Sequence, residues 1–121
     1  MLGYVTIGTS NFDGALTFYD ALVTAIGGKR AFPSPTGQFY SFAQGSLFGV
    51  LRPHNGQPAS GGNGSMLAFK VAAPKDVDRV YDLAIRSGAI DDGKPGPRGD
   101  RGFYGSYFRD ADGNKICVYH M

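Results

Sequence analysis

Aromatic and β-branched residues are concentrated in two adjoining stretches near the carboxyl end of the chain, residues 103–109 and 115–120. Such runs are typical of β-strands, in which successive side chains point to opposite faces of the sheet. The polar segment between them contains Asp112-Gly113-Asn114, and residues of these types favour a tight turn. The pattern predicts a hairpin in which Tyr107 shares one face of the sheet with Cys117. The other face should pack on a helix.

Apolar residues recur at spacings of three and four in two longer segments, residues 13–26 and 74–87. This spacing puts them on one face of a helix, which predicts two amphipathic helices. Thr9-Ser10-Asn11 can cap the first helix, and Pro74 suits the first turn of the second. The residues expected to face the core are Ala15, Phe18, Tyr19, Leu22 and Ile26 in the first helix and Val77, Val80, Tyr81 and Ala84 in the second.

Shorter apolar runs, bounded by Gly, Pro, Asn and Ser, predict six further strands. They cover residues 4–8, 29–32, 38–42, 46–51, 65–71 and 89–91. Residues 93–102 are rich in Gly and Pro and are expected to form a loop, as are residues 53–63 near the middle of the chain.

The order of the predicted elements in the first half of the chain recurs in the second half. When the halves are laid over each other, Tyr19-Asp20 aligns with Tyr81-Asp82, and the expected strand and helix boundaries coincide. Such self-similarity indicates an internal repeat. The prediction is an α+β fold in one domain, residues 1–121, with a βαβββ module at about 1–52, a linker at about 53–63 and a second βαβββ module at about 64–121.

Composition and charge narrow the classes of function. The 12 Lys and Arg residues are scattered along the chain and the net charge is only +2, so nucleic acid is not expected as a partner. No apolar run is long enough for a membrane span, and the amino terminus lacks the pattern of a signal peptide, which places the protein in the cytoplasm by default. A single cysteine excludes an internal disulfide.

Three stretches, FYDAL in the first helix, GNGSMLAFKV at the fifth strand and YFRDADGNKICVY at the end, resemble the vicinal-oxygen-chelate superfamily. This superfamily contains glyoxalases, bleomycin-resistance proteins and extradiol dioxygenases. The terminal hairpin carries the most specific likeness, with Ala111 where proline is common. The resemblance implies that the two modules form a curved mixed-sheet cleft, that the protein is a homodimer, and that enzymes of the group hold a divalent metal in the cleft.

The positions at which the resemblance implies metal ligands carry other kinds of residue in this chain. The positions of the first-strand and fifth-strand histidines fall on Tyr4 and Met66, and the eighth-strand glutamate falls on Cys117. The fourth-strand position falls on Gly49 or Leu51. Hard divalent ions prefer carboxylate and imidazole. We therefore expect neither the metal nor another cofactor.

Side chains on the cleft face of the predicted strands are the candidates for ligand contact. Most are apolar and a few carry hydroxyls, which is typical of a pocket for a small molecule. Arg98 in the following loop could act as an anion clamp. His54 is a weak candidate for a general acid or base, and the alternative is an exposed turn histidine. The predicted ligand-binding residues are Tyr4, Thr6, Met66, Ala68, Tyr107, Cys117 and Arg98.

Three functions remain open at this point. The first is a protein that binds a small, partly apolar molecule without the metal, with or without catalysis. The second is a metal-dependent glyoxalase-like lyase or a dioxygenase with displaced ligands, such as His54 and Asp100, or with a soft metal at Cys117 and Met66. The third is an interaction module with no ligand. We also expect His120 to be an exposed terminal side chain.

Overall fold

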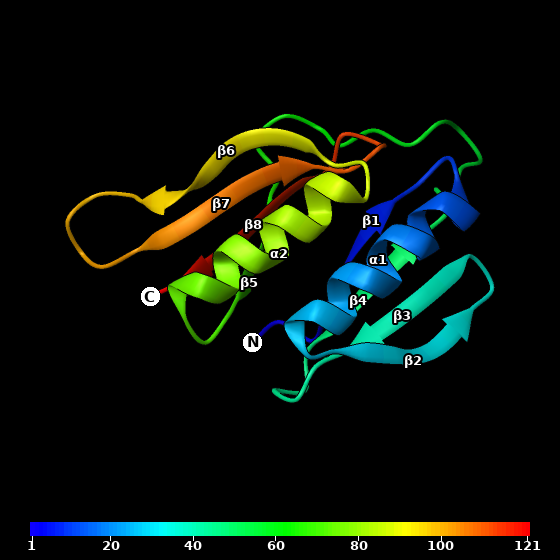
Figure 1. Cartoon of the computed structure of the whole chain (residues 1–121). Helices are drawn as coiled ribbons and strands as arrows, with labels where there is room; N and C mark the ends of the chain where they lie inside the picture. Colours follow the sequence, from blue (N-terminus) through cyan, green and yellow to red (C-terminus); the bar gives the residue numbers. More distant parts are fainter. The chain divides into compact units, whose positions relative to one another are not determined.

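The computed structural model describes all 121 residues, and the chain divides into two compact units, Met1–Gly61 and Gly62–Met121. Each unit contains one helix and four strands, and in each unit the helix lies against one face of the sheet (Figure 1). The two units repeat the same order of elements, βαβββ. The predicted α+β architecture with two such modules is therefore confirmed.

The sheet of the first unit has the strand order β1-β4-β3-β2. β1 runs parallel to β4, and the other neighbours are antiparallel. The elements are β1 (Tyr4–Gly8), α1 (Phe12–Ile26), β2 (Lys29–Ser34), β3 (Gly37–Ser41) and β4 (Leu47–Leu51).

The sheet of the second unit has the corresponding order β5-β8-β7-β6. β5 runs parallel to β8, and β7 pairs with β6 and β8 in antiparallel fashion. The elements are β5 (Leu67–Lys70), α2 (Pro74–Arg86), β6 (Ile90–Pro97), β7 (Tyr104–Arg109) and β8 (Lys115–His120).

The first helix begins and ends where its sequence signals indicate. The Asn11 side chain accepts a hydrogen bond from the Gly14 amide, and Gly27 ends the helix in the left-handed conformation that favours glycine. Tyr19 and Leu22 are buried as predicted, and Val23 is buried with them. The prediction omitted Val23, although it lies four residues after Tyr19 and therefore on the same face.

The second helix buries the four predicted residues, Val77, Val80, Tyr81 and Ala84. It packs on β7 and β8, where Phe108, Ile116 and Val118 are fully buried. The rings of Tyr81 and Phe108 meet edge to face with 6.4 Å between their centroids. Phe108 therefore anchors the sheet to α2. Neither helix of the chain has the length and apolar character needed to cross a bilayer.

The hairpin between β7 and β8 is organised around the buried carboxylate of Asp110. This side chain accepts hydrogen bonds from the amides of Asp112 and Asn114 and from the Asn114 side chain, each at 2.9 Å. The predicted hairpin is confirmed. Of the three turn residues that tolerate a positive φ, Asp112, Gly113 and Asn114, only Gly113 adopts one, of 86°.

β6 is longer than the sequence predicts. The expected strand ended at residue 91 and was followed by a loop, whereas the observed strand reaches Pro97. Its pairing with β7 shifts register between Asp91 and Gly93 and again before Gly96. β6 is an edge strand, where a proline is tolerated because its missing N–H donor can fall on the side that no other strand pairs with. The Gly and Pro residues that indicated a loop are accommodated by these irregularities.

Candidate functional site

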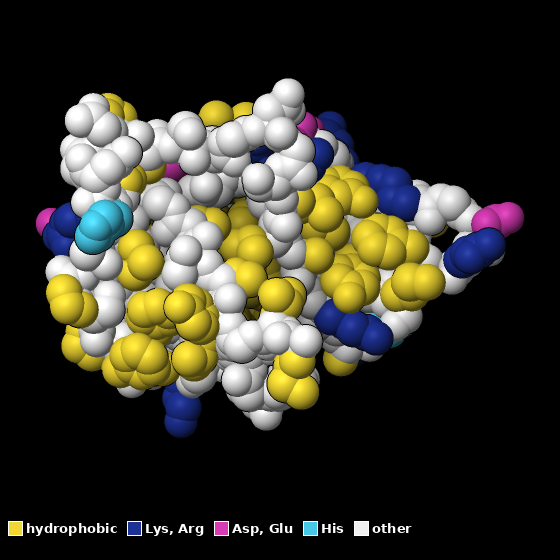
Figure 2. All heavy atoms as spheres, turned by 180° about the vertical axis from the view of Figure 1, so that it is seen from behind, with side chains coloured by type: hydrophobic (Ala, Val, Ile, Leu, Met, Phe, Trp, Pro, Cys, Tyr) yellow, Lys and Arg dark blue, Asp and Glu magenta, His cyan; other side chains and the backbone are white.

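The face of the second sheet that α2 leaves open carries an alternating set of side chains from three strands. In the register of the sheet Tyr107 is the partner of Cys117, Gly105 is the partner of Tyr119, and Ala68 of β5 is the partner of Cys117. Partners across a ladder point to the same face. Figure 2, which is turned by 180° from the view of Figure 1, shows hydrophobic side chains gathered on the face of this unit that lies away from α2, with Lys and Arg side chains beside them.

Glycines let the aromatic rings of this face lie close to the sheet. A Cβ atom on Gly93 would come within 2.7 Å of the Tyr107 ring, and one on Gly105 would come within 2.6 Å of the Phe103 ring. Phe103 stacks on Tyr119 with 5.2 Å between ring centroids and 9° between planes. The rings are half-buried, so they present flat apolar surfaces to whatever lies on the open face.

Two cationic side chains border the Tyr107 ring. The guanidinium of Arg98 lies 5.5 Å and the ammonium of Lys115 lies 5.3 Å from the ring centroid, within the range of cation–π attraction. Arg98 donates to the backbone carbonyls of Lys94, at 2.6 Å, and Pro97, at 3.3 Å. These bonds hold the guanidinium near the ring. The sequence had predicted only that Arg98 lies in a loop.

Cys117 is 1% exposed beneath these groups. Burial raises the pKa of its thiol, and this effect outweighs the hydroxyl of Tyr107 and the charges of Arg98 and Lys115, which act to lower the pKa. Burial and the neighbouring Cys117 also raise the pKa of Tyr107. The approach of Arg98 was not visible in the sequence, but the net effect keeps the thiol protonated near neutral pH, which disfavours a nucleophile.

The first sheet has an open face of the same design. Tyr4 and Thr6 of β1 are exposed, and Phe39 of β3 lies above Gly49, where a Cβ atom would come within 2.8 Å of the ring. Phe39 stacks on Phe32 at 5.1 Å and meets Tyr4 edge to face at 5.8 Å. This face is aromatic, whereas the open face of the second sheet combines aromatic rings with cations.

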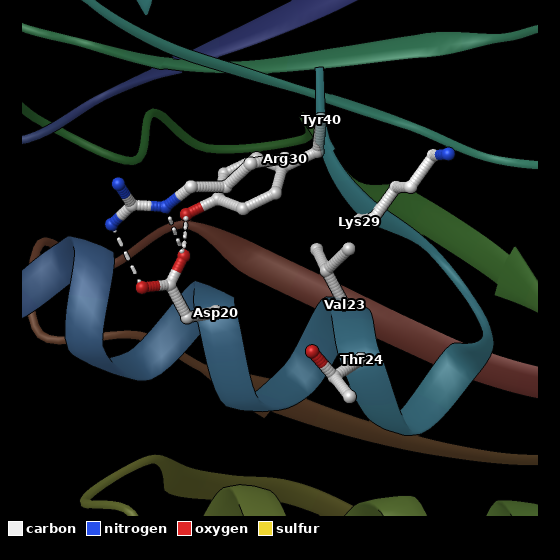
Figure 3. Close-up of a pocket in the computed structure, with 6 residues that line it drawn as sticks. All are labelled: Asp20, Val23, Thr24, Lys29, Arg30 and Tyr40. Carbon is white, nitrogen blue, oxygen red and sulfur yellow. Dashed lines mark hydrogen bonds and ion pairs between the residues drawn. The ribbon is translucent and has the colours of Figure 1, made fainter. Parts of the chain in front are cut away.

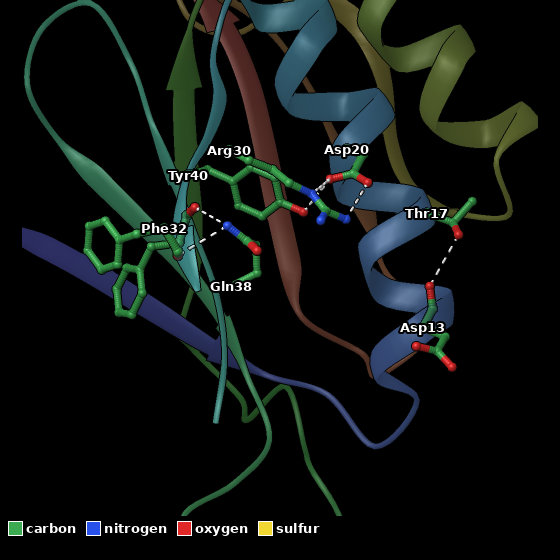
Figure 4. Close-up of polar contacts among 8 residues, drawn as sticks. Asp13, Thr17, Asp20, Arg30, Phe32, Gln38 and Tyr40 are labelled. Atoms are coloured by element: carbon green, nitrogen blue, oxygen red, sulfur yellow. Dashed lines mark hydrogen bonds and ion pairs between the residues drawn. The ribbon is translucent and has the colours of Figure 1, made fainter. Parts of the chain in front are cut away.

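A shallow recess of about 200 Å³ lies on the helix side of the first unit (Figure 3). Arg30 binds the Asp20 carboxylate through two hydrogen bonds of 2.9 and 2.8 Å, and the Tyr40 hydroxyl donates to the same carboxylate at 2.8 Å (Figure 4). The groups therefore satisfy one another and tie α1 to the sheet. The lining residues are Asp20, Val23, Thr24, Lys29, Arg30 and Tyr40.

Stability at acid pH should depend on this ion pair. The hydrogen bonds from Arg30 hold the pKa of Asp20 below its usual value of 3.8. A lowered pKa in the folded state stabilises the fold above the unfolded value, and the contribution is lost as pH falls through the folded value. Because the Asp20 side chain is 41% exposed, we expect a loss of only about 0.5–1 kcal/mol below pH ~4.

Urea unfolding of Asp20→Asn across pH 2–6 would check this expectation, since the variant should lack that part of the pH dependence. Arg30→Gln should flatten the profile similarly, because Arg30 is the main cause of the lowered pKa. An unchanged profile in both variants would contradict the assignment.

The donor set at the implied metal-ligand positions does not suit a hard divalent ion. Tyr4 offers a phenol, Met66 a thioether and Cys117 a buried thiol, and neither Gly49 nor Leu51 offers a side-chain ligand. Met66, just before β5, is 47% exposed. No group of three or more His, Cys, Asp or Glu side chains in the structure is arranged to hold a metal ion.

The two histidines lie in different surroundings. His54 is exposed in a turn that is closed by a hydrogen bond from the Gly56 amide to the Pro53 carbonyl. His120 is half-buried, and its Nδ1 lies 3.1 Å from the carbonyl oxygen of Val71. The expectation of an exposed His120 was wrong, because β8 runs beside the end of β5 and brings the ring to that carbonyl. Asp100, the other displaced ligand considered, is exposed in a bend.

The structure also identifies residues of the open faces that the sequence interpretation left out. Lys115 precedes Cys117 by two positions, so strand alternation could have placed it on the same face. Phe39 and Tyr119 could have been found in the same way. The stacking of Phe103 on Tyr119 depends on the register of β7 against β8, which no local pattern gives.

Comparison with known proteins places these observations in a family. The sequence model of the glyoxalase/bleomycin resistance protein/dioxygenase superfamily matches residues 1–118. A glyoxalase/bleomycin resistance protein from Albidiferax ferrireducens T118 is 35% identical, with a TM-score of 0.91 over 100% of this chain and 98% of that chain. No match was found among curated proteins.

Two more distant structures share the fold. A glyoxalase/bleomycin resistance protein/dioxygenase family enzyme from Burkholderia phytofirmans PsJN is 21% identical, with a TM-score of 0.78 over 98% of this chain and 96% of that chain. A glyoxalase-related enzyme from Fulvimarina pelagi is 18% identical, with a TM-score of 0.79 over 100% of this chain and 88% of that chain.

Proposed function

This chain belongs to the glyoxalase/bleomycin resistance protein/dioxygenase superfamily, and we propose that it binds a small, partly apolar molecule on the open face of its second sheet, without the divalent metal of the metal-dependent members. The observation that carries the proposal is the set of accessible rings around Cys117. Phe103, Tyr107 and Tyr119 lie on a face that no element of the unit covers.

The opposite face of the same sheet shows why these rings are not needed for the core. Phe108, Ile116 and Val118 face α2 and are fully buried, so the hydrophobic core of the unit is already built. The rings of the open face add apolar surface that remains half-exposed. A rigid apolar surface with a few polar groups suits a small ligand, because the rings contribute contact area and the hydroxyl of Tyr107 can orient a polar atom.

The chemistry at the implied ligand positions supports binding without a metal. The buried thiol of Cys117 stands where the metal-dependent proteins of the resemblance carry a carboxylate. Sulfur is a soft ligand, whereas hard divalent ions prefer carboxylate and imidazole. We therefore assign Cys117 to the floor of the binding face, with Ala68 beside it, and assign the contacts with ligand to Tyr107 and Arg98.

A thermal-unfolding screen tests this proposal. Protein purified without chelator should be stabilised by at least one compound from a library of aromatic and heteroaromatic metabolites. A compound at about 100 times its dissociation constant should stabilise the fold by about 2.7 kcal/mol. Addition of EDTA should leave the effect unchanged, because no metal is required.

Two variants of neighbouring tyrosines provide the matched control. Tyr107→Ala should abolish the stabilisation, whereas Tyr104→Ala should retain it, because the Tyr104 hydroxyl points away and donates to Asp78 of α2. A stabilising compound that requires a divalent ion would overturn the metal-free assignment. A broad screen without a stabilising compound would favour an interaction module with no ligand.

A further inference from the structure

We infer that the ligand carries an acidic group, and that Arg98 and Lys115 bind this group above the ring of Tyr107. The inference rests on the proposed function and specifies the class of molecule for the same face. It starts from the distribution of charge over the open face of the second sheet.

The charged side chains around Tyr107 are mainly cationic. Strand alternation puts Arg109 and Lys115 on this face with Tyr107, and Lys70 of β5 is the partner of Tyr119. Arg98 approaches from the end of β6. The one carboxylate among them, that of Asp92, is shared between Arg109 at 3.1 Å and Lys115 at 3.5 Å. Four cations and one carboxylate leave a positive field over the rings, which attracts an anion.

The position of Arg98 is fixed before any ligand arrives. Its two hydrogen bonds to the carbonyls of Lys94 and Pro97 use two of the five N–H groups of a guanidinium. The remaining donors can bind a carboxylate or phosphate through two parallel hydrogen bonds. A preorganised donor reduces the entropy cost of binding. The Lys115 ammonium on the same ring adds a second charge.

The stacked rings of Phe103 and Tyr119 form an apolar surface beside these cations. Gly105 lies beneath this pair and Gly93 lies beneath Tyr107, so the rings of both surfaces lie close to the same sheet. A molecule that fits both surfaces has a flat apolar body and one acidic group, either a carboxylate or a phosphate ester.

Four naphthalene probes that differ only in the substituent test the inference. 2-Naphthoate and 2-naphthyl phosphate carry the two kinds of acidic group, 2-naphthamide is neutral, and 2-naphthylmethylamine is cationic. Binding is measured by titrating each probe into the full-length, ¹⁵N-labelled protein and following the amide resonances of Tyr107, Cys117 and Tyr119. At least one acidic probe should bind about tenfold more tightly than the amide, and the amine should bind most weakly.

Arg98→Gln should remove most of the preference for the acidic probe, and Lys115→Gln should reduce it. Arg101→Gln removes the same charge from an exposed position in the neighbouring bend and should leave the preference intact. The relative strength of the carboxylate and phosphate probes decides which acidic group the face prefers.

The inference is overturned if the amide binds as tightly as both acids at the same resonances, an outcome that leaves the proposed function standing. It is also overturned if Arg98→Gln weakens the acid and the amide by the same factor, since Arg98 would then act only through packing. If no probe shifts these resonances, acid recognition at this face is excluded, and the metabolite screen decides separately whether the face binds any ligand.

Discussion

Phe108→Ala is expected to lower the free energy of unfolding by about 3–5 kcal/mol, because it empties a fully buried site between the sheet and α2. Tyr107→Ala, one residue earlier on the opposite face, should cost about 1 kcal/mol, since its ring is half-buried. Equilibrium urea unfolding of the two variants, followed by far-UV circular dichroism, measures both values.

Stabilisation by a bound compound should depend on Tyr107 and not on Phe108, the opposite of the order expected for the free energy of unfolding. A library compound that stabilises the wild type should still stabilise Phe108→Ala at a temperature where that variant is folded, and should fail to stabilise Tyr107→Ala. Leu in place of Phe108 retains most of the apolar volume and serves as a folded variant if alanine is not tolerated. Equal losses of stability at the two positions would contradict the division of β7 into a core face and an open face.

Asp110→Ala is expected to destabilise the protein by about 2–4 kcal/mol, because the substitution leaves two backbone amides and the Asn114 side chain without their acceptor in a buried turn. Urea unfolding gives the equilibrium value. The loss of the turn should also appear as faster hydrogen exchange of the amides of Asp112 and Asn114.

Asp110→Asn provides a graded control for this turn. One amide oxygen can still accept from both backbone amides, but the second carboxylate oxygen, which accepts from the Asn114 side chain, is lost. The loss of stability should therefore be about half of that in the alanine variant. An alanine variant as stable as the wild type would show that the carboxylate does not organise the hairpin.

Local sequence patterns were sufficient to predict the elements whose turns and buried faces depend on residues close together in the chain. The hairpin of β7 and β8 combines two runs of aromatic and β-branched residues with a turn that Asp110 closes through neighbours two and four residues away. The stripe Val77, Val80, Tyr81 and Ala84 needed only helical spacing and a proline at the start. The placement of Tyr107 on the same face as Cys117 followed directly from the alternation.

Long-range pairing explains what the sequence could not give. The strand β6 contains Gly93, Pro95, Gly96 and Pro97, which indicate a loop on local grounds, and its extension depends on the hydrogen bonds that β7 provides. The approach of Arg98 to Tyr107 follows from that pairing. The contact of His120 with Val71 likewise joins segments that are distant in the chain.

The candidate site was predicted in part for the same reasons. Alternation identified Tyr107, Cys117 and Ala68 as neighbours on one face, and the register of the sheet joins them in this way. The positions of the rings depend on where glycines of the neighbouring strand fall opposite them, as with Gly93 of β6 opposite Tyr107 of β7. A one-residue slip in register would remove that match, and a single sequence does not show the register.

The central claim is that the open face of the second sheet binds a small, partly apolar molecule without a metal. The most direct measurement is a crystal structure of the chain with its best-stabilising library compound, grown in the presence of EDTA. Density for the compound should lie against the rings of Tyr107, Phe103 and Tyr119 with no ion beside it. Density only in the recess beside Arg30, or density that requires a metal to appear, would contradict the claim.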